Sequence, residues 1–144
     1  MSKHPFFFFL TAVLVLVTAV HILGMYLYWY WRIPWLDLIA HFGGGVWAGG
    51  MSLLFFYEFK RRKMASLPGV FMSAIFVFAS VVVIGVAWEL FEIAIRSVSL
   101  AEPGYWQDTI VDLIADTTGA LTAVWYFFVR RYNTGVGVLP HENS

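Results

Sequence analysis

Long apolar runs such as FFFFLTAVLVLVTAV and FMSAIFVFASVVVIGVAW dominate the chain, and short polar segments separate them. About 18 or more consecutive apolar residues are typical of a helix that crosses a membrane. We therefore predict four membrane-spanning helices, over residues 6–30, 36–59, 69–96 and 107–130. The predicted fold is all-α: a polytopic membrane protein in which residues 1–144 form a single transmembrane domain, a four-helix bundle.

Helix-breaking residues and charges lie between the predicted spans. Pro34 separates the first span from the second, because proline ends or kinks a helix. A basic run at residues 60–63 and a Pro-Gly pair at 68–69 precede the third span, and Glu-Pro-Gly at 102–104 precedes the fourth. The N-terminal run has no small-residue cleavage site, so we expect a retained first span rather than a signal peptide.

The placement of lysine and arginine predicts the orientation, since cytoplasmic loops carry an excess of both. With the N-terminus in the cytoplasm, the other side holds Arg32 and Arg96, and the cytoplasmic side holds Lys3, Lys60, Arg61, Arg62, Lys63, Arg130 and Arg131. Tyrosines and tryptophans crowd residues 26–35, as in the aromatic belt of a membrane interface. We expect both termini in the cytoplasm and the chain in a bacterial inner (plasma) membrane.

Composition removes several classes of function. The 144 residues are 60% hydrophobic and 12% charged, with a formal net charge of zero. No basic surface is present for nucleic acid, so nucleic acid is not an expected partner. The chain has no cysteine, which excludes disulfides and thiolate metal sites.

Six of the nine acidic residues fall at the outer ends of the second, third and fourth predicted spans: Asp37, Glu89, Glu92, Asp108, Asp112 and Asp116. Spacings of three or four residues place side chains on one helical face, and His41 shares the face of Asp37. Ionisable groups inside membranes are costly, and they usually pair, bind ions or line a cavity. We therefore expect these residues to line a shared polar site that opens outward.

Small residues accompany the acids on the same three spans. They are Gly44, Gly45, Ala48, Gly49, Gly85, Gly119 and Ala120. Glycine and alanine let transmembrane helices approach closely, so these residues predict tight packing around the site.

The strings DLIAHFGGG, WELFEIAI and QDTIVDLIADTTGA resemble the small VanZ-like and YjdF-like bacterial membrane proteins. The resemblance covers residues 36–120, and the matching positions are Asp37, His41, Glu89, Glu92, Asp108, Asp112 and Gly119. It implies a role at the cell envelope. Asp116 is less clearly part of that pattern, and its role depends on spacing alone.

A divalent cation would resolve the repulsion within such a cluster. Carboxylate oxygens favour magnesium, calcium or manganese, and one histidine also admits zinc or iron. We expect the cation to be held by Asp37, His41, Asp108, Asp112 and Asp116. The expected activity is that of a metal-dependent hydrolase or transferase acting on a lipid or lipid-linked envelope molecule, with Glu89 or Glu92 as general base.

Two other functions stay open at this stage. The carboxylates of a proton- or cation-coupled transporter would form a relay, which requires a polar path through the membrane. In a non-catalytic accessory subunit the acids would form a structural network, and the partner would be a larger membrane complex. Membrane lipids are expected partners in every case, and a homo-oligomer is open.

His21 lies about nine residues before the outer end of the first predicted span, hence roughly 13 Å below that interface. Its depth is comparable with that of Asp116, and Glu89 is slightly shallower. An imidazole in an apolar helix needs a polar partner. We therefore predict that His21 lines the floor of the acidic site.

Overall fold

The computed structural model describes residues 5–63, 69–94, 100–101 and 103–133. These residues form helices and no strand, so the prediction of an all-helical protein is confirmed. The helices are α1 (Pro5–Tyr26), α2 (Trp29–Arg32), α3 (Leu36–Lys63), α4 (Val70–Ala94) and α5 (Tyr105–Asn133). Three of the predicted spans agree with α3, α4 and α5 to within a few residues.

The first predicted span, 6–30, is too long by one turn. The helix α1 ends at Tyr26, because Tyr28 adopts a left-handed conformation with φ of 58° that no α-helix tolerates. The single turn of α2 follows, and the Ile33 amide bonds the Trp29 carbonyl at 2.8 Å. Pro34 then precedes α3, as expected for a residue that interrupts helices.

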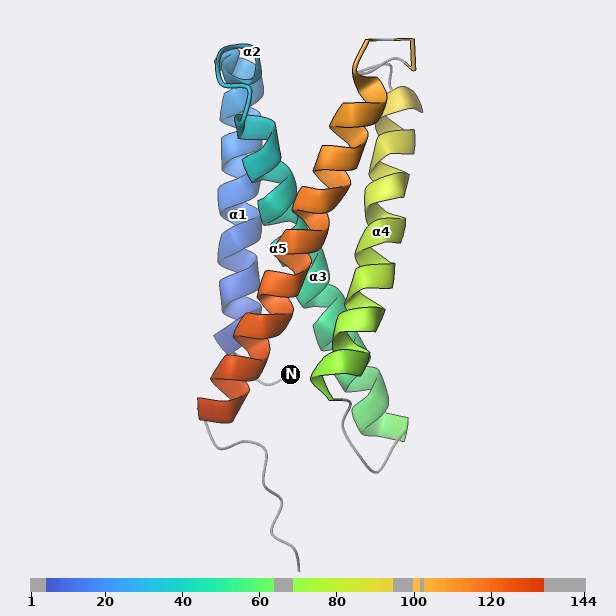
Figure 1. The fold of residues 1–144 in the computed structure, drawn as a ribbon. Helices are drawn as coiled ribbons and strands as arrows, with labels where there is room; N and C mark the ends of the chain where they lie inside the picture. The colour runs from blue at the N-terminus through green and yellow to red at the C-terminus, as the bar shows by residue number, and fades with distance from the viewer. Residues whose placement is uncertain (1–4, 64–68, 95–99, 102, 134–144) are drawn as a thin grey trace, which may run out of the picture.

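The two central helices, α3 and α5, cross each other (Figure 1). The helix α1 lies beside α3, and α4 lies beside α5. The packing of α3 against α5 is the most extensive in the molecule. The start of α1 and the end of α5 lie at one end of the molecule, and α2 lies at the other. We call the latter the α2 end; the start of α3, the end of α4 and the start of α5 share it.

Glycines make the crossing of α3 and α5 possible. A Cβ added to Gly45 would overlap the backbone carbonyl of Asp116, and one added to Gly119 would overlap the carbonyl of Phe42. At Gly49 the added atom would lie 2.6 Å from the Cα of Ala120. The predicted tight packing is therefore confirmed at Gly45, Gly49 and Gly119, where the backbones meet without intervening side chains. It is wrong at Gly44, where an added Cβ would meet nothing within 4 Å.

Away from the α2 end, the space between the helices is filled by apolar and aromatic side chains. Leu10, Leu53, Val77 and Ala120 are fully buried there. The Phe6 ring of α1 meets the Phe127 ring of α5 edge-on, with centroids 5.2 Å apart. Other rings connect the same helices or join α3 to α4, including the stacked pairs Phe9–Tyr126 and Phe56–Phe76.

Among the described residues, three helices are long and apolar enough to cross a membrane: Pro5–Tyr26, Leu36–Lys60 and Val70–Ala94. The helix α5 spans 29 residues, but three aspartates in its first half set it apart from these. Large apolar side chains cover the outside of the helices; Val15 is 63% exposed and Phe71 76%. Such a surface suits lipid rather than water.

Candidate acidic–histidine site

The imidazole of His41 is the centre of the acidic cluster. Its Nε2 lies 3.9 Å from Oδ1 of Asp37, one turn earlier in α3, and 3.8 Å from Oδ2 of Asp112 in α5. Its Nδ1 lies 3.5 Å from Oδ1 of Asp116. The His41 side chain is only 13% exposed, and Asp112 is buried. Two helices that are distant in sequence thus bring four predicted site residues together.

Asp37, His41 and Asp112 form a group that could hold one metal ion. Each offers one ligand atom, and these atoms all lie within 4.8 Å of one another. Ligand atoms around one divalent ion are roughly 3–5 Å apart when each bond is roughly 2.0–2.6 Å long. The three atoms therefore surround a space of the right size, and their mixed chemistry suits manganese, iron or zinc.

Asp116 lies on the other side of the imidazole from this group. Its Oδ1 faces Nδ1 of His41, and a Cβ added to Gly85 of α4 would lie 3.2 Å from its Oδ2. A carboxylate that accepts the Nδ1–H of a histidine leaves Nε2 free for a metal and fixes the ring. Asp116 was predicted as a metal ligand, but this geometry suits it to orient the His41 ring instead.

Glu89 is buried, and it accepts hydrogen bonds from neutral groups. Its Oε2 accepts hydrogen bonds from the Thr109 hydroxyl at 2.9 Å and from the Tyr105 hydroxyl at 3.2 Å. Both donors belong to α5, so Glu89 joins α4 to α5 at the α2 end. The general-base role predicted for Glu89 is untested, and these bonds give that carboxylate a second, structural task.

Tyr105 and Thr109 were not among the residues predicted for the site, although the sequence contains a signal for them. Tyr105, Thr109, Asp112 and Asp116 follow one another at spacings of four, three and four residues, which is the repeat of a single helical face. The polar face of α5 therefore extends from the Glu89 contact to the crossing with α3.

Asp108 and Glu92 lie at the rim of the cluster. Asp108 is exposed in the first turn of α5 and is not part of the group of Asp37, His41 and Asp112. Glu92 is half-buried near the end of α4. Burial raises the pKa of the Tyr30 phenol, and the carboxylates of Asp37 and Glu92 raise it further. The four-residue spacing of Glu92 and Arg96 also permits an ion pair between them, but Arg96 lies outside the described residues.

His21 is held by a tyrosine of the α1–α3 connection. Its Nδ1 lies 2.8 Å from the hydroxyl of Tyr30 in α2. The polar partner predicted for His21 is therefore the Tyr30 hydroxyl rather than a carboxylate of α4 or α5. If His21 belongs to the acidic site, it would be linked to that site through its contact with Tyr30.

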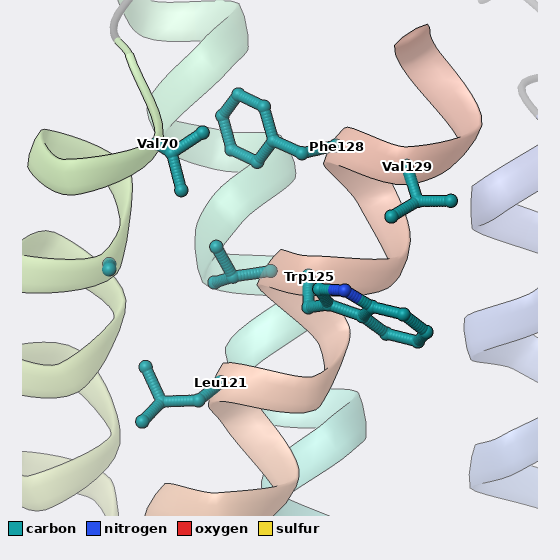
Figure 2. A pocket seen from close by; sticks show the side chains of 7 residues that line it. Val70, Leu121, Trp125, Phe128 and Val129 are labelled. Atoms are coloured by element: carbon teal, nitrogen blue, oxygen red, sulfur yellow. The ribbon is translucent and has the colours of Figure 1, made fainter. Parts of the chain in front are cut away.

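Two apolar hollows formed by the described residues lie apart from the acids. A groove of about 450 Å³ between α4 and α5 is lined by Val70, Ala74, Leu121, Val124, Trp125, Phe128 and Val129. Figure 2 shows Val70 and Phe128 facing each other across it, while the Trp125 indole points towards α1. A second hollow of about 390 Å³ between α1, α3 and α5 is also lined almost wholly by apolar residues. Neither contains an acid.

Residues 2–133 match a protein-family model described as "Predicted membrane protein (DUF2238)". No curated protein matches the chain. No solved structure matches it either.

Proposed function

The chain belongs to the DUF2238 family of predicted membrane proteins, and on that premise we propose that it binds a divalent cation between its helices. The observation that carries the proposal is the convergence of Asp37, His41 and Asp112, from two helices, on one small space. Carboxylates this close together in an apolar surrounding need a positive charge between them. A bound cation would supply it.

In this proposal α5 is the fourth membrane span, which completes a four-helix bundle. Its 29 residues exceed the roughly 20 that a membrane requires. Two of its three aspartates, Asp112 and Asp116, face His41, so they need not face lipid. Both termini would then lie in the cytoplasm and the acidic site near the outer face of a bacterial inner membrane, in keeping with the resemblance to VanZ-like and YjdF-like proteins.

The proposed substrate is a lipid or a lipid-linked envelope molecule. The site lies among helices whose outer surfaces are apolar, so a molecule in the membrane reaches it without crossing water. The cation would polarise a phosphoryl or acyl oxygen, or activate water, as in a metal-dependent hydrolase or transferase. Glu89 or Glu92 would act as the general base, and one oxygen of Glu89 also accepts two hydrogen bonds.

A transporter finds less support in the described residues. It would need polar groups that continue from the acidic cluster towards the opposite end. Among the described residues, the buried polar or charged side chains are Ser73, Glu89 and Asp112. Only Ser73 lies away from the α2 end. The Ser73 hydroxyl donates to the carbonyl of Gly69, which directly precedes the same helix, so it continues no path.

The proposal is tested by manganese binding to the detergent-purified wild-type chain, because Mn²⁺ accepts both carboxylate and imidazole and is visible by electron paramagnetic resonance. We expect one Mn²⁺ per chain. Because the cation binds only the folded site, Mn²⁺ at 100 times its dissociation constant should stabilise the protein by about 2.7 kcal/mol. Removal with a chelator should reverse this gain. A chain that binds no Mn²⁺, nor any other divalent cation in metal analysis, would overturn the proposal.

The orientation is tested separately with reporter fusions. Fusions after Arg62 and Arg131 should report the cytoplasm, and a fusion near Glu102 should report the outside, because the basic residues are concentrated at the first two positions. An alkaline phosphatase and a fluorescent reporter at each position provide mutual controls. A cytoplasmic signal at Glu102 would put the acidic site on the inner face.

A further inference from the structure

The helix α4 touches the polar face of α5 at two points that lie one turn apart on α4. At the first point, Oε2 of Glu89 accepts hydrogen bonds from the hydroxyls of Thr109 and Tyr105, at 2.9 and 3.2 Å. At the second, four residues earlier in α4, a Cβ added to Gly85 would lie 3.2 Å from Oδ2 of Asp116. Residues four apart share a helical face, so one face of α4 meets one face of α5.

The same face of α5 carries the two aspartates that meet His41. Asp112 follows Thr109 by three residues, and Asp116 follows Asp112 by four. Oδ2 of Asp112 lies 3.8 Å from Nε2 of His41, and Oδ1 of Asp116 lies 3.5 Å from Nδ1. A helix turns as a unit, because its backbone hydrogen bonds fix each residue relative to the next. The contact that holds Thr109 against α4 therefore also sets the direction in which Asp112 points.

Close packing of α4 against its neighbours does not by itself require a carboxylate at position 89. The buried residues of α4 recur at every fourth position, and they are Ser73, Val77, Val81, Gly85 and Glu89. An apolar side chain would continue this stripe without the cost of removing a carboxylate from water. Glu89 is only 8% exposed, so the two hydroxyls of α5 offset part of that cost. The presence of the acid thus points to the hydrogen bonds it makes with α5.

We propose that Glu89 is a positioning residue of the cation site, which acts through the hydroxyls of Thr109 and Tyr105. The two hydrogen bonds hold α5 in the rotation that turns Asp112 towards His41. The inference rests on the proposed function, because it assigns Glu89 a task at the proposed cation site. Loss of an outer hydrogen bond of a metal site usually weakens metal binding by about 10–100-fold. These bonds act through the helix rather than on a ligand itself, so we expect the lower end of that range.

The test is the Mn²⁺ affinity of detergent-purified variants, measured together with the unfolding midpoint in the absence of metal. Thr109→Val keeps the shape of the side chain and removes its hydroxyl, so it should weaken Mn²⁺ binding by about 10-fold. Thr109→Ser keeps the hydroxyl and should bind like the wild type. Thr118→Val is the matched control and should also bind like the wild type, because the exposed Thr118 hydroxyl donates to the Ile114 carbonyl within α5.

Substitution of Glu89 itself distinguishes a positioning residue from a metal ligand. Glu89→Gln keeps an oxygen that accepts both hydrogen bonds, so it should keep most of the affinity. Glu89→Leu removes both bonds and should weaken binding at least as much as Thr109→Val. When Thr109→Val is added to Glu89→Leu, it should have no further effect, because the two residues act through one contact.

A purely structural role of Glu89 would lower the metal-free midpoint of Thr109→Val and leave its Mn²⁺ affinity unchanged. Wild-type affinity in Thr109→Val, with Asp112→Asn weakened, would therefore overturn the inference and leave the cation site standing. Equal losses in Glu89→Gln and Glu89→Leu would overturn it as well, because they would indicate a direct role of the charge. Absence of Mn²⁺ binding in the wild type would overturn both the inference and the proposed function.

Discussion

Replacing Gly45 with leucine is expected to prevent the correct packing of α3 against α5. A Cβ at position 45 already overlaps the Asp116 carbonyl, which is backbone and cannot rotate away. The two helices would have to separate along their most extensive interface, at a cost of about 3 kcal/mol or more. The measurement is the monodisperse fraction after detergent extraction, together with the thermal unfolding midpoint.

Gly44 provides a matched control in the same run of glycines. An added Cβ there meets nothing within 4 Å, so Gly44→Leu should fold like the wild type. The loss of a helix-interior glycine should even favour α3 by up to about 1 kcal/mol. Equal midpoints for the two variants would show that Gly45 does not lie at the crossing.

His41→Ala and Asp112→Asn are each expected to weaken Mn²⁺ binding by at least about 100-fold. Both remove an atom that would bind the ion itself, and this should cost no less than the loss of an outer-shell partner. Asparagine keeps the size of the buried Asp112 and removes only its charge, so the metal-free protein should still fold. Isothermal titration and paramagnetic resonance measure the affinity, and the stabilisation by Mn²⁺ should vanish in both variants.

Substitutions of the other two aspartates of α5 should weaken Mn²⁺ binding less than His41→Ala and Asp112→Asn do. Asp108→Asn changes an exposed carboxylate outside the ligand group, so its effect on affinity should be the smallest. Asp116→Asn should weaken Mn²⁺ binding more than Asp108→Asn and less than His41→Ala, because it disturbs the orientation of His41 rather than a metal bond. If His41→Ala binds Mn²⁺ as tightly as the wild type, the site does not hold the cation.

The helices were largely predictable because their apolar runs are long and their interruptions chemically plain. The end of α1 was not predictable from the sequence. Tyrosine rarely adopts a left-handed conformation, so no local signal distinguishes Tyr28 from the helix before it. The cause is tertiary: the turn allows the Tyr30 ring to rest on Gly24, a residue six positions earlier.

The meeting of Asp37, His41 and Asp112 follows from sequence spacing plus the cost of charge in a membrane. Spacing separates the polar residues of α5 into two faces, but it does not show which face meets α4. Residues four apart drift by about 40° per step, so Asp108, two steps before Asp116, leaves the inner face of α5. Thr109 and Tyr105 take the inner positions, and their hydroxyls bind Glu89. Which residues of α5 face α4 depends on the rotation of α5 about its own axis. The packing of all the helices sets that rotation.

The crossing of α3 and α5 also has a consequence for biosynthesis. A ribosome delivers α3 to the membrane first, and its glycines and His41 must wait there until α5, the last helix of the described chain, emerges. During that interval the face that later contacts α5 meets lipid or the insertion machinery. A nascent chain cut short before α5 therefore presents an unpaired polar face inside the membrane, which is the kind of defect that membrane proteases recognise.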